Sequence, residues 1–313
     1  MAFVQPKETY SGKVYSISIG RGSKGITFGG EKVLPFHGFE GASPNKPVIA
    51  HEIQDVPPND WPEEAQKPYK DVSSSPEAWA KFCQDSLGAK VIALRLAGTH
   101  PDRNDRSPED AAKTVKDVIS SLEIPLIILG SNHAEKDSSV LVAAAEAAKD
   151  GNCIIGKAQE ANYKTIAAAA MASNHKLIAM SELDINLSKQ LNILISQMGF
   201  DKERIITDPM CSALGYGLEY TYSVMERIRL AALAQNDITM QQPILGDVGM
   251  YVWKVKETQA EEKDVPQWGS LEERSIAWEA VTATALLIAG AELLIMRHPR
   301  AIEAVEKVIE ELC

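Results

Sequence analysis

The sequence is poor in cysteine and has no close cysteine pair. Its 313 residues include four cysteines, none within 50 residues of another: Cys83, Cys153, Cys211 and Cys313. This spacing excludes a CxxC motif and the ligand runs of iron–sulfur and zinc sites. The six histidines show no H-E-x-x-H or His-x-His spacing, so we expect no resident metal ion. We expect the cysteines to lie reduced in the interior of a cytosolic protein.

Positive charge is also scarce. Acidic residues outnumber basic residues by 43 to 32, and no run of Lys or Arg interrupts this excess. We therefore expect neither a nucleic acid nor a membrane among the partners. The longest uncharged apolar run, Ala280–Ala291, is too short to cross a bilayer. The first ten residues carry Lys7 and Glu8 and no apolar core, which predicts no signal peptide and a cytoplasmic protein.

Short apolar runs alternate with helical patterns along most of the chain. Their continuous hydrophobicity is typical of parallel strands that are buried on both faces. The repeat of about 35 residues predicts an α/β fold, a TIM (β/α)8 barrel over residues 48–313. The eight predicted strands are Val48–Ala50, Val91–Leu94, Leu126–Leu129, Cys153–Ile155, Leu177–Ala179, Arg204–Thr207, Pro243–Leu245 and Leu293–Met296.

Residues 1–47 are predicted to form a separate N-terminal β extension. Lys13–Ile19 alternates between polar and apolar residues, and Ile26–Phe28 and Lys32–Leu34 are candidate pairing partners. We expect a small antiparallel meander that closes the bottom of the barrel or docks a partner. Gly20–Gly25 matches G-x-G-x-x-G, but no helix is expected after it. We therefore interpret it as a hairpin turn and not as a dinucleotide site.

Several helix termini are marked by capping residues. Asp184 and the Ser107-Pro108 pair are typical N-terminal signals, and Pro299 begins the last predicted helix. An alanine-rich helix is predicted to begin at Asp137 and to end at Gly151.

Three of the loops that follow predicted strands are long. They are Glu52–Pro76, which carries five prolines and is expected to be stiff and non-helical, Asp208–Gly217, and Gly246–Gly269. Active sites of TIM barrels lie at this C-terminal face. Long loops here predict a broad platform, which suits a large flat ligand or a protein better than a small substrate.

A few charged residues near strand ends are candidates for chemistry. Lys157 follows a strand and has the position of a Schiff-base lysine, but we interpret it as solvated or salt-bridged. Asp208 and Asp247 end adjacent strands, and Glu182 and Asp184 follow another. Such carboxylates could form a general acid–base pair, or they could hydrogen-bond a polar ligand or cap the loops. The second interpretation is favoured, and both remain open at this point.

Three segments carry a specific resemblance. SGKVYSISIG at 11–20, DPMCSALGYGLEYTY at 208–222 and GDVGMYVWKVKE at 246–257 resemble the small subunit of the corrinoid iron–sulfur protein of the acetyl-CoA (CO dehydrogenase/acetyl-CoA synthase) pathway. The resemblance implies a TIM barrel related to pterin-binding methyltransferases. It also implies a larger partner subunit that holds a 4Fe–4S cluster and most of a shared corrinoid (cobalamin-type) cofactor.

The implied function is methyl carriage without catalysis by this chain alone. The carrier would take a methyl group from methyltetrahydrofolate, through a separate methyltransferase, and pass it to acetyl-CoA synthase. The barrel would cover one face of the corrinoid at the subunit interface. From loop position alone, the candidate cofactor-binding residues are Asp208, Ser212, Gly215, Tyr216, Gly217, Asp247, Gly249, Met250 and Tyr251.

The alternative is a pterin-dependent methyltransferase on the same barrel. That enzyme would need carboxylate and amide side chains at strand ends to bind the edge of the pterin, and Asp208, Asp247 and Asn132 are candidates.

Overall fold

Eight parallel strands close into the predicted barrel in the computed structural model of the chain, which describes residues 3–41 and 43–312. The strands follow one another around the barrel in sequence order, and the last pairs with the first. Each strand overlaps its predicted run. Their bounds are β3 Val48–Gln54, β4 Val91–Arg95, β5 Leu126–Leu129, β6 Ile154–Ala158, β7 Lys176–Met180, β8 Ile205–Asp208, β9 Ile244–Asp247 and β10 Ala291–Met296.

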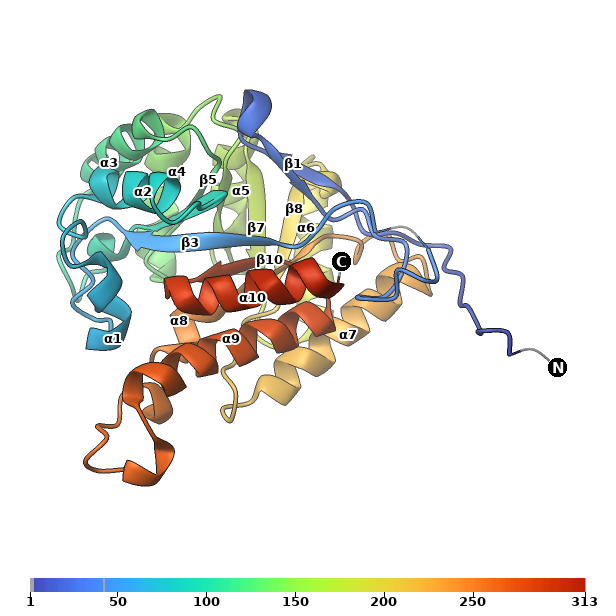
Figure 1. The fold of residues 1–313 in the computed structure, drawn as a ribbon. Coiled ribbons are helices and arrows are strands. Elements are labelled where there is room, and N and C mark those ends of the chain that lie inside the picture. Colours follow the sequence, from blue (N-terminus) through green and yellow to red (C-terminus); the bar gives the residue numbers. More distant parts are fainter. Residues whose placement is uncertain (1–2, 42, 313) are drawn as a thin grey trace.

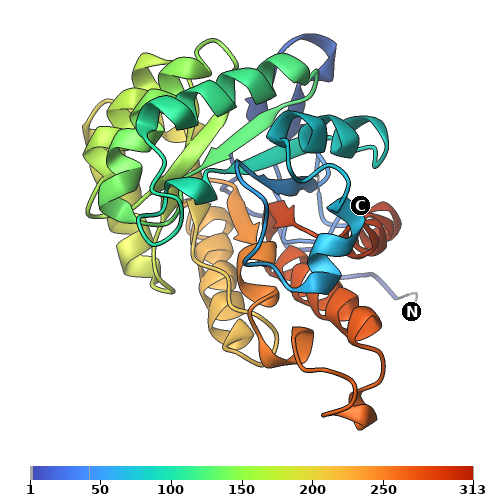
Figure 2. The ribbon, with the colours of Figure 1, turned by 90° about the vertical axis from the view of Figure 1, so that its left-hand side faces the viewer.

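Helices surround the barrel as an outer layer (Figures 1 and 2). Ser107 opens α3 with a capping box, and the Asp184 carboxylate accepts backbone N–H bonds at the start of α6, as predicted. The long helices are α2 Pro76–Asp85, α3 Pro108–Ser121, α4 Ala134–Ala147, α5 Tyr163–Ala172, α6 Ile185–Gln197, α7 Leu218–Leu233, α9 Leu271–Ala289 and α10 Pro299–Leu312.

The N-terminal residues close the bottom of the barrel, as expected. Strands β1 (Ile17–Ile19) and β2 (Ile26–Phe28) form an antiparallel hairpin. Its apolar side chains join the core cluster inside the barrel. Gly20–Gly25 forms the turn of this hairpin and includes one short 3-10 helix, which confirms the interpretation of the glycine motif.

The prediction of a third strand in the meander, at Lys32–Leu34, is wrong. Residues 32–34 form bends, although Val33 is buried. Gly29 and Gly30 both have positive φ values, of 78° and 95°, which turn the chain out of the hairpin direction. One backbone hydrogen bond, from Val14 to Glu31 (2.8 Å), remains where the third strand was expected.

Two further predictions, one of a non-helical loop and one of a helix start, also need correction. The proline-rich loop after β3 contains a short helix, α1 (Glu63–Gln66), which begins after Pro62; the Pro62 carbonyl accepts from the backbone of Ala65 (3.0 Å) and Gln66 (3.2 Å). Helix α4 begins at Ala134, because the His133 side chain caps it by accepting from the backbone of Lys136 (3.2 Å). Asp137 lies inside that helix instead, and its carboxylate accepts from the backbone N–H groups of residues 131 and 132.

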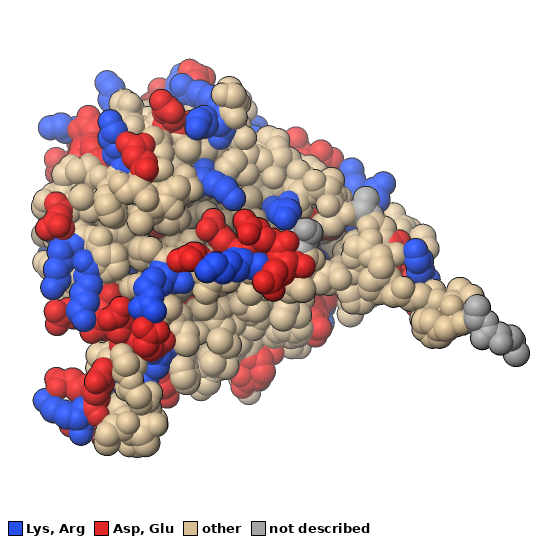
Figure 3. Space-filling view, in the orientation of Figure 1, with Lys and Arg blue, Asp and Glu red and all other residues tan. Residues whose placement is uncertain are grey.

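The burial of the described cysteines and the distribution of surface charge agree with the expectations from composition. Cys83, Cys153 and Cys211 are buried free thiols, and burial raises the pKa of Cys83 and of Cys153 to about 12, whereas Cys313 lies outside the described residues. On the face seen in Figure 3, acidic and basic side chains are interspersed without a broad basic patch. None of the helices in residues 3–41 and 43–312 is long and apolar enough to cross a membrane.

Candidate functional site

The C-terminal ends of the barrel strands form the mouth of the barrel, where α1 and α8 (Val248–Val252) lie (Figure 2). A buried chain of six charged side chains, here named the mouth network, crosses it. Positive and negative groups alternate along the network, and no member has more than 3% of its side chain exposed. The order is Arg297, Glu52, Arg95, Asp247, Lys157, Asp208.

The contacts of the mouth network are short. Glu52 lies between two guanidinium groups: its Oε1 is 2.6 Å from Arg95 Nε and its Oε2 is 2.9 Å from Arg297 Nε. Asp247 Oδ2 lies 2.9 Å from Arg95 Nη2 and 2.7 Å from Lys157 Nζ. Lys157 Nζ also lies 2.8 Å from Asp208 Oδ2. Three positive and three negative charges therefore balance within the barrel.

Strand alternation explains most of this arrangement. Side chains two residues apart point to the same face of a strand. Five members of the mouth network stand two residues after an apolar residue of the inner core, in the pairs Ala50–Glu52, Ala93–Arg95, Ile206–Asp208, Leu245–Asp247 and Ile295–Arg297. Lys157 is the exception, because the pairing of β6 with β7 shifts between Ile155 and Ala158. Sequence reasoning missed Glu52, Arg95 and Arg297, although this two-residue offset at five strand ends was a usable signal.

Electrostatics favour the ionised forms of Asp247 and Lys157. Burial alone would raise the pKa of Asp247, but the charges of Arg95 and Lys157 hold it well below its usual range. Burial would lower the pKa of Lys157, and the facing carboxylates of Asp208 and Asp247 raise it instead. Lys157 is therefore a salt-bridged ammonium, as predicted. A lysine whose pKa is raised is poorly suited to act as a Schiff-base nucleophile, and carboxylates already paired with cations are poor general bases.

The nine candidate cofactor-binding residues do not form one cluster. Asp208, Asp247 and Gly249 are buried in or against the mouth network, and Ser212 is 8% exposed. Met250 and Tyr251 are half-buried beside it. The segment Gly215–Gly217 lies against Ser212 and, among the described residues, makes no hydrogen bond with the mouth network: Leu214, before it, is held by α9, and Tyr216 Oη donates to Glu257 (2.9 Å).

Asn132, a candidate of the pterin alternative, also lies at the mouth. Its Nδ2 is 3.6 Å from the sulfur of Met250. Both residues line an open cavity of about 360 Å³ above the mouth network. An aromatic cluster supports one side of the mouth, since the Arg297 guanidinium stacks 4.4 Å from the ring of Trp61 and Tyr69 Oη donates to the Arg297 carbonyl (2.5 Å).

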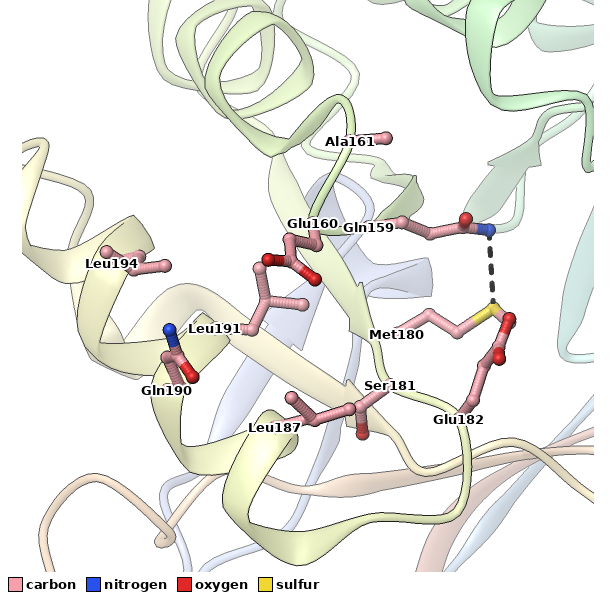
Figure 4. A pocket seen from close by; sticks show the side chains of 10 residues that line it. All are labelled: Gln159, Glu160, Ala161, Met180, Ser181, Glu182, Leu187, Gln190, Leu191 and Leu194. Atoms are coloured by element: carbon pink, nitrogen blue, oxygen red, sulfur yellow. Dashed lines mark hydrogen bonds between the residues drawn. The ribbon is translucent and has the colours of Figure 1, made fainter.

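A second groove, of about 380 Å³, lies on the same face between the ends of β6 and β7 and helix α6 (Figure 4). Its aliphatic lining includes Leu187, Leu191 and Leu194, with two carboxylates at Glu160 and Glu182. Ser181 Oγ, which lines it, has no hydrogen-bond partner among the described residues. The groove can take an apolar group, but it contains no arrangement typical of an acid–base or nucleophilic centre.

Glu279, a residue of α9 that contacts the backbone after β10, is expected to make the stability of the protein depend on pH. This fully buried carboxylate accepts from the backbone N–H groups of Arg297 (2.6 Å) and His298 (3.0 Å), and burial raises its pKa to about 7. Between pH 4.5 and about 7, Glu279 is therefore protonated in the folded state and ionised in the unfolded state. The stabilisation is present below pH 4.5 and is lost as the pH rises to about 7, by roughly 3 kcal/mol at most.

We expect Glu279→Gln to flatten the fall in the free energy of unfolding between pH 5 and pH 7.5. Urea denaturation at each pH measures this, and the difference between the two curves isolates Glu279 from other titrating groups. Glu226→Gln, at an exposed position of α7, is the matched control and should leave the slope unchanged. An unaltered slope in Glu279→Gln would show that this carboxyl does not carry the effect.

The comparisons with known proteins settle the family. The family model described as CO dehydrogenase/acetyl-CoA synthase delta subunit matches residues 16–308. The chain belongs to this family. The resemblance to the corrinoid iron–sulfur protein small subunit is thereby confirmed, and this delta-subunit membership places the chain in the acetyl-CoA pathway.

Two curated relatives illustrate the relationship. The acetyl-CoA decarbonylase/synthase complex subunit delta of Methanothermobacter thermautotrophicus is 33% identical, and the alignment covers 98% of this chain and 78% of the relative. The delta subunit of Methanosarcina mazei is 36% identical, over 93% and 67% respectively. Members of this delta-subunit family are thus named as parts of a multisubunit complex.

Solved structures support the fold alone. Xanthomonas albilineans dihydropteroate synthase with 4-aminobenzoic acid matches with a TM-score of 0.60 at 13% identity, over 95% of this chain and 97% of that chain. At this identity the similarity shows that this delta-subunit barrel shares the architecture of those enzymes.

Proposed function

We propose that this delta-family chain is a non-catalytic barrel subunit whose mouth covers one face of a corrinoid held mainly by a larger, cluster-bearing partner. The observation that carries the proposal is the neutral mouth network. Each of its six charges is paired with at least one opposite charge, at the position where a barrel enzyme needs free acids and bases. The mouth therefore supplies a preformed surface instead of reactive groups.

The exposed rim suits a corrinoid by its chemistry. A corrin ring has a flat apolar face and peripheral amide groups that need hydrogen-bond partners. Met250 offers an apolar contact beside the amides of Gln54 and Asn132, all of which line the mouth cavity. Tyr251, which follows Met250 in the chain, is half-buried near Lys157, Asp208 and Asp247. Of the nine candidates, Met250 and Tyr251 are the best placed for direct contact.

The chain's own contribution is to shield one face of the corrinoid from water and to uncover it when a partner docks. When bound, the corrinoid supplies the cobalt that carries the methyl group between a methyltetrahydrofolate-dependent methyltransferase and acetyl-CoA synthase. The barrel mouth excludes water from the covered face and moves aside when either partner docks. No residue of the mouth network needs to transfer a proton.

Anaerobic absorption spectroscopy tests this proposal. We expect corrinoid absorption only when the chain is co-expressed with its large cluster-bearing subunit, and no methyl transfer by the chain alone. Calorimetric titration with methyltetrahydrofolate should give no binding to the purified chain. Tight corrinoid binding, pterin binding or turnover by the chain alone would overturn the proposal in favour of the pterin-dependent methyltransferase.

A further inference from the structure

The cavity above the mouth network contains a buried cation with unused hydrogen-bonding capacity. Arg95, only 3% exposed, lines this cavity of about 360 Å³. Its Nε and Nη2 donate to Glu52 and Asp247, whereas Nη1 has no hydrogen-bond partner among the described residues. An unpaired donor on a buried guanidinium is costly unless a ligand satisfies it.

A second cation in the same cavity makes no ion pair. Lys254, in the loop after α8, is exposed, and no carboxylate in residues 3–41 and 43–312 lies within 4.0 Å of its ammonium group. Burial of part of the side chain, followed by the charges of Arg297 and Arg95, lowers its pKa. Lys254 is thus repelled by two guanidinium groups, and the more weakly acting carboxylates of Asp60 and Asp247, neither of them paired with it, offset this only in part.

The buried carboxylates near the cavity already form ion pairs with other cations. Glu52 lies between Arg95 and Arg297, and Asp247 lies between Arg95 and Lys157. At the rim, Asp60 pairs with Arg103. Asp102 has 92% of its side chain exposed, so solvent screens its charge. The inner part of the cavity therefore keeps positive potential in a chain whose net charge is −11.

The donors favour a tetrahedral oxyanion. They line one cavity from three separate elements: Arg95 at the end of β4, Lys254 in the loop after α8, and Asn132, whose amide also contacts Met250 Sδ (3.6 Å), in the loop after β5. A phosphate group offers oxygens in several directions, whereas a carboxylate offers two in one plane. Guanidinium and ammonium groups are the usual partners of phosphate in proteins.

We propose that this cavity binds the phosphate group of a ligand through Arg95 and Lys254. The site does not depend on the corrinoid proposal. Two sources share the required chemistry: the phosphodiester in the nucleotide tail of a corrinoid, and the phosphate of a separate small ligand.

Titration of the purified chain with inorganic phosphate at constant ionic strength tests the site. We expect saturable binding to the wild-type chain, followed by calorimetry, and at least tenfold weaker binding to Lys254→Met. Lys256→Met, at an exposed lysine of the same loop, should bind phosphate like the wild type. Absence of saturable binding to the wild type, or equal affinities of the two variants, would overturn the proposal.

The source of the phosphate is assigned in the complex with the large subunit. Retention of cobalamin is compared with retention of cobinamide, a corrinoid that lacks the phosphodiester. If Lys254→Met removes the preference for cobalamin, the phosphate belongs to the corrinoid tail. If the preference persists while the chain's phosphate affinity still depends on Lys254, the phosphate belongs to a separate ligand. A complex without corrinoid, formed from a chain that binds phosphate, would refute the proposed function and leave this site intact.

Discussion

Replacing Lys157 by methionine is expected to lower the free energy of unfolding by about 3–5 kcal/mol. The ammonium group lies within 2.8 Å of two carboxylates that are fully buried. Without it, Asp208 keeps no cationic partner in the mouth network, and Asp247 keeps only Arg95. A buried carboxylate without compensation costs far more than the lost contact itself.

Chemical denaturation measures the effect of Lys157→Met, and a second variant separates charge from packing. Lys157→Met combined with Asp208→Asn removes one charge of each sign, so it should recover a large part of the loss. The amide oxygen that this second substitution introduces can still accept the backbone N–H of Met210, as the Asp208 carboxylate does at 2.9 Å. If the double variant were as unstable as the single one, lost packing and not charge balance would explain the cost.

The second large effect concerns the cofactor. In the complex with the large subunit, Met250→Arg is expected to reduce corrinoid retention roughly a hundredfold, equivalent to about 3 kcal/mol. A guanidinium at this position would have to lose water against the apolar face of the ring. In the unbound chain it can reach solvent, because Met250 lines an open cavity, so the fold should persist.

Equilibrium dialysis of the loaded complex measures corrinoid retention. Met250→Leu keeps the apolar contact and should bind nearly as well as the wild type, and Val142→Arg, at an exposed position of α4, should have no effect. Gly249 is a poorer test position, since a Cβ there would lie 2.7 Å from the Arg297 side chain and would disturb the mouth network itself. Full retention by Met250→Arg would remove this residue from the corrinoid surface.

The wrong or incomplete expectations share a cause. The third strand of the meander failed because two positive-φ glycines redirected the chain, which residue type permits but does not require. Asp137 lies within α4 because His133 caps the helix and the carboxylate turns back to the preceding loop. In both cases several local conformations were compatible with the sequence, and the structure shows which one the chain adopts.

The sequence by itself determined the barrel, the order of its strands, the hairpin at its base and the family. Apolar runs buried on both faces, and motifs spread along the whole chain, carry that information locally. Only the tertiary structure decided that Glu52, Arg95, Lys157, Asp208, Asp247 and Arg297 form one neutral network. These residues lie on six strands or strand ends separated by up to 245 positions, and barrel closure alone brings their charges within 3 Å. Ion pairing between such distant positions depends on the register of every strand, which no local pattern records.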